Sequence, residues 1–255
     1  MLEVKDLHVN YGAVHALNGI SLHVDDGEIV SLIGANGAGK TTTLRTITGL
    51  EKAASGSVMF DGHDLRKAEP SKIITYKLAH VPEGRHIFPQ MTVEENLEMG
   101  AYADPAGKEE TMKDVYKRFP RLEERRRQLA GTLSGGERQL TLIARALAQQ
   151  ARILLMDEPA ANLDYGNQFR LLQQVRRLTE QGYTVLLSTH NPEHALRFAT
   201  HVLALHGGTV AACGPVKEML TEELLHTLYR IPLTVAQVPV TGGTVRSCVY
   251  DPAKP

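Results

Sequence analysis

The amino-acid sequence predicts an α/β fold: a parallel sheet with helices, an antiparallel β subdomain and an inserted helical subdomain. Strand and helix patterns alternate near both ends of the chain, as they do in folds built on parallel sheets. Between them, residues 92–150 show apolar residues at helical spacing, dense charge and no β-branched runs. This change of pattern indicates that a helical segment interrupts the sheet-forming part of the chain.

Local patterns predict the individual elements in order. Gly-containing turn motifs between β-prone segments predict three hairpins, at residues 25–27, 61–62 and 206–208. Continuous apolar runs predict strands that are buried on both faces, at residues 151–156 and 183–188, and a further strand is expected at residues 28–33. An amphipathic pattern predicts a helix at residues 165–180, and helices are also expected at residues 41–50, where Gly49 is a C-cap, and at residues 221–229. The last residues are polar and Gly-rich.

Composition and charge exclude several classes of protein. The 255 residues are 42% hydrophobic, which is enough to bury a full core. The 28 Lys and Arg residues nearly balance 29 Asp and Glu residues, which argues against a nucleic-acid binder that relies on a net basic field. Cys213 and Cys248 are too few for a disulfide scaffold and match no metal-binding spacing, so we expect free thiols in a reducing compartment.

The sequence also predicts a cytosolic protein. No apolar run approaches the roughly 20 residues that a membrane-spanning helix needs. The opening MLEVKDLHVNYG carries charges and lacks the apolar core of a signal peptide. If the protein works at a membrane, something other than its own chain anchors it there.

Residues 34–41 match the phosphate-binding pattern GxxxxGK[ST]. In this pattern glycines let backbone N–H groups surround phosphate oxygens, and the following helix adds its positive N-terminus. Lys40 reaches the terminal phosphates and Thr41 ligates Mg²⁺. Because strand, loop and helix occur in the required order, we predict that this segment binds a nucleoside triphosphate. The loop residues expected to bind nucleotide are Gly34, Asn36, Gly37, Gly39, Lys40, Thr41 and Thr42.

Two carboxylates end the apolar strand at 153–156. Asp157 is placed to hold the Mg²⁺ shell, and Glu158 to polarise a water for attack on the γ-phosphate. On their own, these residues would be a solvated acidic strand end. Together with the phosphate loop they indicate hydrolysis.

The segment LSGGE at 133–137 has two compatible interpretations. Ser134 and Glu137 have the spacing of a capping box that begins the next helix. Ser134, Gly135 and Gly136 at a helix N-terminus also form an anion site that suits a γ-phosphate.

In this order and spacing, the phosphate loop, LSGGE and ILLMDEP resemble the ATP-binding subunit of an ATP-binding cassette (ABC) transporter over nearly all of residues 1–235. The resemblance implies an ATPase made of two subunits packed head to tail, with ATP between one phosphate loop and the partner's Ser134–Gly136 segment. It also implies that Tyr11 stacks on adenine, that His190 contacts the γ-phosphate, and that Asp164 lies in the loop crossing the dimer interface.

The same resemblance divides the chain into parts. Residues 1–91 and 151–212 correspond to a P-loop NTPase (RecA-like) nucleotide-binding core with its β subdomain, and residues 92–150 to the helical signature subdomain. Residues 213–235 form a C-terminal helix region, and residues 236–255 a tail.

Two positions depart from the family pattern. Glu83 stands in the Q-loop, where most members have Gln; there it can approach Mg²⁺ or water but adds negative charge beside a polyphosphate. Glu137 replaces the Gln that usually ends the signature, and either side chain closes the capping box. Before the signature, Arg121 and the run Arg125–Arg127 fit a solvated helix face, with the loops of a membrane partner as the alternative.

The two halves of the chain resemble different importers. Residues 1–137, which include Val-Pro-Glu-Gly-Arg at 81–85, resemble ATPases of branched-chain amino-acid importers. Residues 138–235 resemble those of iron-chelate, cobalamin or molybdate importers. In this family the permease docks beside the Q-loop and the helical insert, so residues 83–137 favour amino-acid transport.

The partners implied are transmembrane permease subunits, a second identical or different ATPase subunit and, indirectly, a substrate-binding protein. The chain would lie peripherally on the cytoplasmic face of the membrane, and nucleic acid is not expected as a partner. The alternative function is a soluble ABC ATPase in an assembly or repair system.

Overall fold

The fold is organised around a six-stranded sheet with strand order β10–β9–β3–β8–β7–β6. The computed structural model describes residues 1–84, 86–103 and 105–252. Every neighbouring pair in this sheet is parallel except β9 and β10. Its strands are β3 (Ile29–Ile33), β6 (Leu78–Val81), β7 (Ile153–Met156), β8 (Thr184–Thr189), β9 (His201–His206) and β10 (Thr209–Pro215). The α/β fold class and the parallel sheet are therefore confirmed.

A smaller antiparallel sheet has the strand order β2–β1–β4–β5. Its strands are β1 (Leu2–Tyr11), β2 (Val14–Val24), β4 (Ser55–Phe60) and β5 (His63–Asp64). The predicted hairpins at residues 61–62 and 206–208 are confirmed by the β4–β5 and β9–β10 pairs.

The predicted hairpin at residues 25–27 is wrong, because β2 and β3 belong to different sheets. Strand β2 pairs with β1, whereas β3 lies between β8 and β9 and has no free edge for it. The Asp-Asp-Gly sequence does make a turn, but this turn passes from one sheet to the other.

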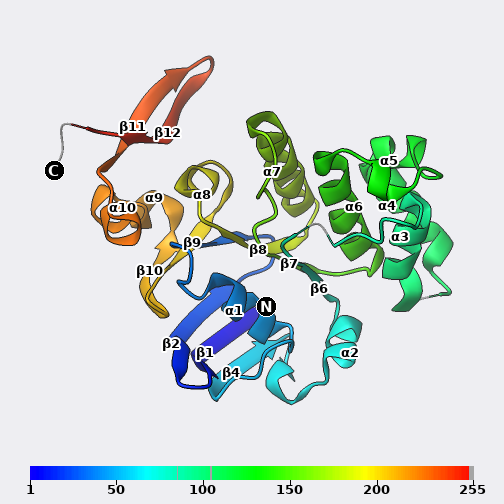
Figure 1. Ribbon diagram of the computed structural model, residues 1–255, viewed down its shortest axis with the longest axis horizontal. Coiled ribbons are helices and arrows are strands. Elements are labelled where there is room, and N and C mark those ends of the chain that lie inside the picture. Colours follow the sequence, from blue (N-terminus) through cyan, green and yellow to red (C-terminus); the bar gives the residue numbers. More distant parts are fainter. Residues whose placement is uncertain (85, 104, 253–255) are drawn as a thin grey trace.

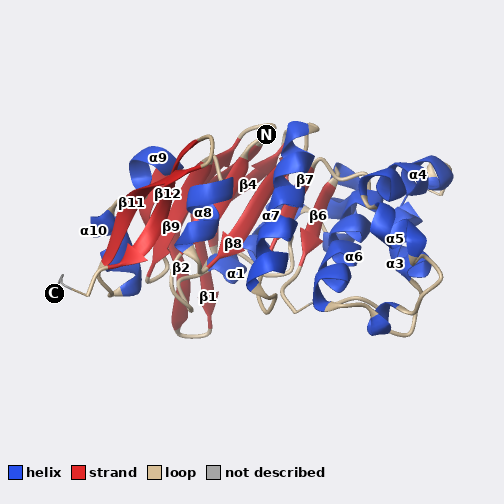
Figure 2. Cartoon of the chain, turned by 90° about the horizontal axis from the view of Figure 1, so that it is seen from above, coloured by secondary structure: helices blue, strands red, loops and turns tan. Residues whose placement is uncertain are grey.

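Helices pack on both sides of the central sheet. Figure 1 shows α7 and α8 on one side, with α1 and the antiparallel sheet on the other. Seen from above in Figure 2, a lobe of helices α3 to α6 extends beyond strand β6. The helices are α1 (Lys40–Ile47), α2 (Pro70–Ile73), α3 (Val93–Gly100), α4 (Lys108–Arg118), α5 (Pro120–Glu124), α6 (Gly135–Ala148), α7 (Tyr165–Glu180), α8 (Pro192–Phe198), α9 (Val216–Met219) and α10 (Glu222–Tyr229), with 3₁₀ turns at Leu65–Lys67, Ile74–Tyr76, Ala101–Ala103 and Ala130–Thr132.

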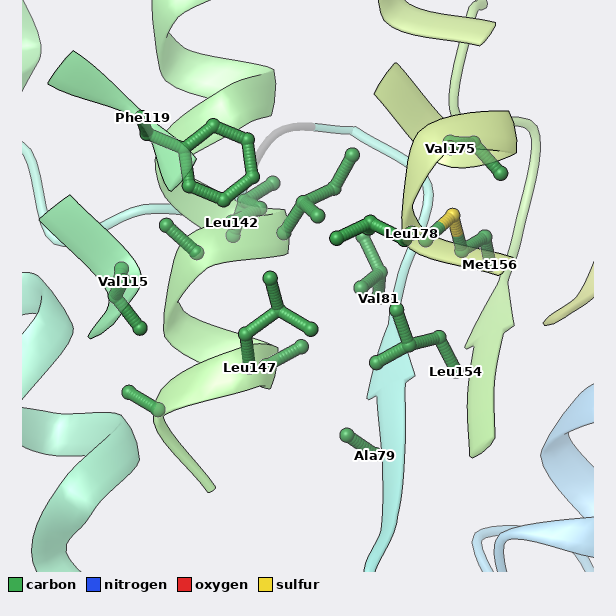
Figure 3. Close-up of a cluster of buried hydrophobic side chains, with 14 of the residues drawn as sticks. Ala79, Val81, Val115, Phe119, Leu142, Leu147, Leu154, Met156, Val175 and Leu178 are labelled. Carbon is green, nitrogen blue, oxygen red and sulfur yellow. The ribbon is translucent and has the colours of Figure 1, made fainter. Parts of the chain in front are cut away.

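A shared hydrophobic cluster joins the helical lobe to the sheet. Leu142 and Leu147 of α6 belong to the same buried cluster as Val81 of β6 and Leu154 of β7 (Figure 3). A second cluster fills the space between the two sheets and includes Leu44 of α1. The lobe that carries the signature is thus packed against the strands that carry the acidic residues.

The C-terminal residues form a hairpin that the sequence analysis did not predict. Strands β11 (Leu233–Val240) and β12 (Gly243–Tyr250) form a separate two-stranded sheet in the described part of the chain, and β12 packs on α8. The Glu193 carboxylate of α8 accepts hydrogen bonds from the Ser247 hydroxyl at 3.1 Å and from the Cys248 N–H at 2.8 Å. Within the described chain, every helix is too short or too polar to cross a lipid bilayer.

Candidate nucleotide site

The loop between β3 and α1 has a backbone path that requires glycine. Gly34 has φ +150°, and a Cβ there would lie 2.3 Å from the Leu205 carbonyl oxygen. Gly39 has φ +104°, and a Cβ there would lie 2.5 Å from the Leu17 side chain. The loop can therefore curve tightly, and its backbone can approach a ligand closely, only because these positions lack side chains.

Lys40 is the first residue of α1, and its side chain lies within the curve of the loop. Its Nζ donates to the Gly34 carbonyl at 2.8 Å and to the Ala35 carbonyl at 3.2 Å. The same Nζ lies 3.6 Å from Glu158 Oε1. Lys40 is only 6% exposed, so its ammonium group is held inside the loop by these contacts.

Thr41 and Asp157 bring two oxygen ligands together from distant parts of the chain. The Thr41 hydroxyl donates to Asp157 Oδ1 over 3.1 Å, across the gap between α1 and the end of β7. A hydroxyl and a carboxylate beside a phosphate loop are the hard oxygen donors that Mg²⁺ prefers. The residues present therefore fit a magnesium ion.

Glu158 lies between a lysine and a histidine. Its Oε2 is 3.0 Å from His190 Nδ1, and its side chain is 10% exposed. Its backbone is left-handed, with φ +45°, which is uncommon for a residue with a side chain. From this backbone position the carboxylate contacts both Lys40 and His190.

Lys40, Glu158 and His190 line one cavity of about 550 Å³. It includes Glu83, so the Q-loop position reaches the same space as the phosphate loop. Arg85, the last residue of the Val-Pro-Glu-Gly-Arg segment, lies outside the described residues. The cavity is lined by Ala16, Asn36, Gly37, Ala38, Gly39, Lys40, Thr41, Thr42, Glu83, Glu158, Ala161, Asn162 and His190.

Other sequence-predicted residues lie elsewhere on the described chain. Tyr11 ends β1 and is 43% exposed, outside the lining of this cavity. Asp164 caps α7, where its Oδ1 accepts the Asn167 N–H at 2.9 Å, and this hydrogen bond helps to keep its pKa below the usual range. Ser134 and Gly136 line a different cavity of about 490 Å³. The single chain therefore does not bring the signature residues to its own phosphate loop.

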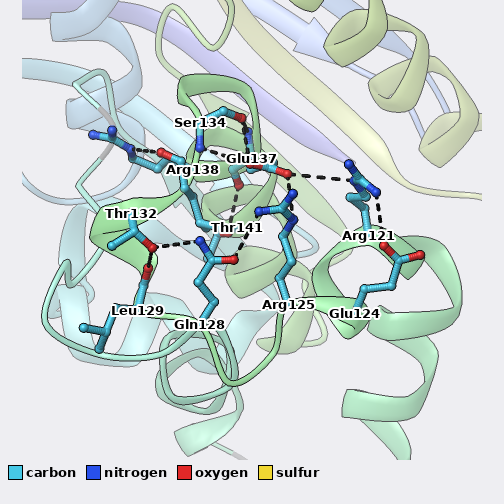
Figure 4. A network of polar contacts seen from close by, with 11 residues as sticks. Arg121, Glu124, Arg125, Gln128, Leu129, Thr132, Ser134, Glu137, Arg138 and Thr141 are labelled. Carbon is cyan, nitrogen blue, oxygen red and sulfur yellow. Dashed lines mark hydrogen bonds and ion pairs between the residues drawn. The ribbon is translucent and has the colours of Figure 1, made fainter.

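The signature begins α6 with the predicted capping box. The Glu137 N–H donates to Ser134 Oγ, while Glu137 Oε2 accepts from the Ser134 N–H at 3.0 Å and from its hydroxyl at 2.8 Å. Figure 4 shows Arg121 and Arg125 extending towards the same carboxylate. The pattern favoured a solvated arginine face, but Arg125 Nε is 3.1 Å from Glu137 Oε1.

Ser188 is a site residue that the sequence analysis missed. Its hydroxyl, at the end of β8, donates to Asp157 Oδ1 at 2.6 Å and accepts the Glu158 N–H at 2.8 Å. The side chain is fully buried. In the sequence, the one signal for Ser188 is its place near the end of a buried strand. Its contact with Asp157 depends on the pairing of β8 with β7, which the sequence does not reveal.

His194 is a buried histidine of α8, and its ring contacts polar side chains. Its Nε2 lies 3.2 Å from Gln168 Oε1, and its Nδ1 lies 3.2 Å from the Thr189 hydroxyl. Burial, together with the nearby His190, lowers the pKa of His194 to about 4. The ring is therefore neutral at physiological pH and acts as a fixed packing and hydrogen-bonding group.

Comparison with known proteins agrees with this geometry. Residues 17–161 match a family model described as ABC transporter. The chain is 40% identical over 233 residues to the high-affinity branched-chain amino acid transport ATP-binding protein BraG of Pseudomonas aeruginosa, covering 90% of this chain and 99% of that protein. It is 31% identical to the iron(3+)-hydroxamate import ATP-binding protein FhuC of Bacillus subtilis, covering 98% and 95% of the two chains.

A solved structure gives the same result for the fold. The dimeric post-hydrolysis state of an ATP-binding cassette bound to ADP and phosphate matches with a TM-score of 0.75 and 28% identity, over 85% of this chain and 99% of that one. Family model, sequence relatives and fold all agree. The chain belongs to the ABC transporter family, as one of its ATP-binding, ATP-hydrolysing importer subunits.

Proposed function

We propose that the cavity between the phosphate loop and the end of β7 binds Mg²⁺-ATP, and that Glu158 is the general base for its hydrolysis. The observation that carries this proposal is that Lys40, Glu158 and His190 meet around one cavity, with contacts of 3.6 and 3.0 Å. Cavities of several hundred Å³ are the usual size for such ligands. Glu83 lies at the same cavity, where it would tune the charge near the polyphosphate.

The chain's own groups have distinct roles in this proposal. Lys40 exchanges its carbonyl partners for phosphate oxygens, and the loop N–H groups surround the same anion. Thr41 and Asp157 would hold Mg²⁺, which would neutralise developing charge on the phosphate oxygens. Glu158 accepts a proton from the attacking water, and His190, hydrogen-bonded to Glu158 Oε2, orients that carboxylate and faces the γ-phosphate.

We further propose that a second ATPase subunit completes the site. Ser134, Gly135 and Gly136 lie at the start of α6, apart from the nucleotide cavity of their own chain. In a head-to-tail pair they would meet the γ-phosphate bound by the other subunit. Tyr11 would then stack on the adenine and Asp164 would lie at the interface. The dimeric cassette with ADP and phosphate supports this arrangement.

The cargo proposed is a branched-chain amino acid, moved by permease subunits that hold this chain at the cytoplasmic face and receive cargo from a binding protein. The 40% identity with BraG over 90% of the chain supports this choice. An iron-chelate importer is the second candidate, because the similarity to FhuC extends over 98% of the chain, including its C-terminal part. We propose that residues 83–137, within and beside the helical subdomain 92–150, select the permease.

Hydrolysis by the purified chain tests the site. Lys40→Ala should abolish ATP binding and turnover, because it removes the cation facing the β- and γ-phosphates. Glu158→Gln should retain binding but slow hydrolysis by roughly two orders of magnitude or more. With ATP, this second variant should elute at twice the 28.0 kDa monomer mass. Unchanged hydrolysis by Lys40→Ala would refute the assignment.

Permease stimulation tests the cargo. Membrane subunits of a branched-chain amino-acid importer should stimulate ATP hydrolysis by the unaltered chain, whereas those of an iron-chelate importer should not. Replacing residues 83–137 with the matching segment of an iron-chelate ATPase should reverse this preference while basal hydrolysis survives. If only chelate-type membrane subunits stimulate the unaltered chain, the second candidate is correct.

A further inference from the structure

Glu137 places a negative charge inside an anion-binding motif. Its Oε2 lies 3.0 Å from the Ser134 nitrogen and 2.8 Å from Ser134 Oγ. The carboxylate side chain is 15% exposed, so water screens its charge only weakly. Left uncompensated, this charge would repel the γ-phosphate that Ser134 and its neighbours are proposed to receive.

Two arginines lie against this carboxylate from the segment before the signature. Arg125 Nε is 3.1 Å from Glu137 Oε1, and Arg121 Nε is 3.9 Å from the same oxygen. Burial alone would raise the pKa of Glu137, but the Ser134 hydrogen bonds and the two arginines outweigh it and lower that pKa. The carboxylate therefore stays ionised with these two cations beside it.

Arg125 is held more firmly than Arg121. Its side chain is 34% exposed against 64% for Arg121, and Arg121 also forms an ion pair with Glu124 at 3.2 Å. The Arg125 guanidinium donates to Gln128 Oε1 at 3.1 Å. Gln128 in turn donates to the Thr132 hydroxyl at 2.8 Å (Figure 4). The Arg125 guanidinium is thus held by Glu137 on one side and by Gln128 on the other, next to the signature segment.

We propose that Arg125 is a positioning residue for ATP hydrolysis, which cancels the charge of Glu137 so that Ser134, Gly135 and Gly136 can receive the γ-phosphate bound by the other subunit. This inference rests on the proposed head-to-tail function. Arg125 does not contact the nucleotide; it acts through Glu137. Its contribution should therefore depend on which residue occupies position 137.

A double-mutant cycle tests this dependence. Arg125→Gln should lower kcat and ATP-driven dimerisation by about tenfold, a coupling typical of residues in direct contact. Binding of ATP to the monomer should not change, because each chain binds nucleotide in its own phosphate loop. In the Glu137→Gln background, the same Arg125→Gln change should alter kcat by less than about threefold. Arg125→Lys, which keeps the charge, should recover most of the loss.

The matched control is Arg127→Gln, which removes the same charge from an exposed arginine; the arginines that pair with Glu137 in the described structure are Arg121 and Arg125. It should behave like the unaltered chain. An equal loss of kcat in Arg125→Gln and Arg127→Gln would overturn the inference. So would additive effects of Arg125→Gln and Glu137→Gln on kcat. If Arg125→Gln alone folds poorly, the Glu137→Gln/Arg125→Gln double variant is compared with Glu137→Gln alone, since neither leaves an unpaired carboxylate. A kcat that differs by more than about threefold between these two would overturn the inference. If the unaltered chain neither dimerises with ATP nor hydrolyses it, the proposed function fails instead.

Discussion

Replacing Ser188 with Ala removes one hydroxyl that holds both acidic residues of the nucleotide site. The Ser188 Oγ donates to Asp157 Oδ1 at 2.6 Å and accepts the Glu158 N–H at 2.8 Å, and Ser188 is fully buried. A hydrogen bond to a charged group contributes about 1.5–3 kcal/mol, and the Glu158 N–H would lose its partner as well. We expect the free energy of unfolding to fall by about 2–3 kcal/mol.

The same change should slow hydrolysis more than it weakens binding. Glu158 has a left-handed backbone, with φ +45°, that its N–H contact with Ser188 helps to maintain. If most of the lost energy appears in the transition state, kcat falls roughly ten- to hundredfold. The Kd for ATP should change by less than about threefold, because Lys40 and the loop are untouched.

Steady-state ATPase assays, equilibrium ATP binding and urea unfolding measure these three quantities. Ser31→Ala is the matched control, since Ser31 is also fully buried on the neighbouring strand β3 but its hydroxyl has no hydrogen-bond partner among the described residues. It should leave kcat unchanged and unfolding within about 1 kcal/mol. If Ser188→Ala behaves like Ser31→Ala, the reasoning about Asp157 and Glu158 is wrong.

Three further predictions concern other parts of the fold. The folded pKa of His194, about 4, lies below its ordinary value of 6.5, so its contribution to stability is complete above pH 6.5 and is lost as the pH falls from 6.5 towards 4. His194→Gln should remove up to about 2.4 kcal/mol of this pH dependence in urea unfolding between pH 7 and pH 4.5, and an unaltered slope would count against it. Glu193→Gln should loosen the C-terminal hairpin by weakening its contact with Cys248. Burial raises the pKa of the Cys248 thiol to about 11, so we expect maleimide to label Cys248 several times faster in the variant. Exposed Cys213 should react as before. Ser134→Arg should keep ATP binding near normal in the monomer but abolish turnover; loss of monomer binding would show that Ser134 serves its own chain's nucleotide.

Much of the fold could be predicted because local patterns determined it. The buried strand at 153–156 and the helix at Tyr165–Glu180 follow from apolar periodicity, and the capping box at Ser134 follows from residue spacing. The error at residues 25–27 shows the limit of such patterns. A turn sequence indicates that the chain reverses, but strand pairing depends on which edges the rest of the fold leaves open.

The site was predictable only where a motif carried it. Lys40, Asp157 and Glu158 lie in contiguous patterns, whereas Ser188 depends on the pairing of β7 and β8. Arg125 could be placed in a charged cluster, but its contact with Glu137 arises from the way the segment before the signature packs against α6. The C-terminal hairpin carries the same kind of turn signal, Gly242-Gly243 between β-branched residues, but its partly exposed strands lie beyond the alternating strands and helices of the core.

Subunit complementation tests most directly the claim that two chains share each ATP site. Lys40→Ala destroys the phosphate loop of one chain, and Ser134→Arg blocks the signature of the other, so neither variant alone should hydrolyse ATP. In an equimolar mixture, half of the dimers carry one intact site formed by Lys40 of one chain and Ser134 of the other. Hydrolysis should then recover to about a quarter of the unaltered rate if the sites act independently. A mixture of folded variants that stays as inactive as either component would contradict the shared site.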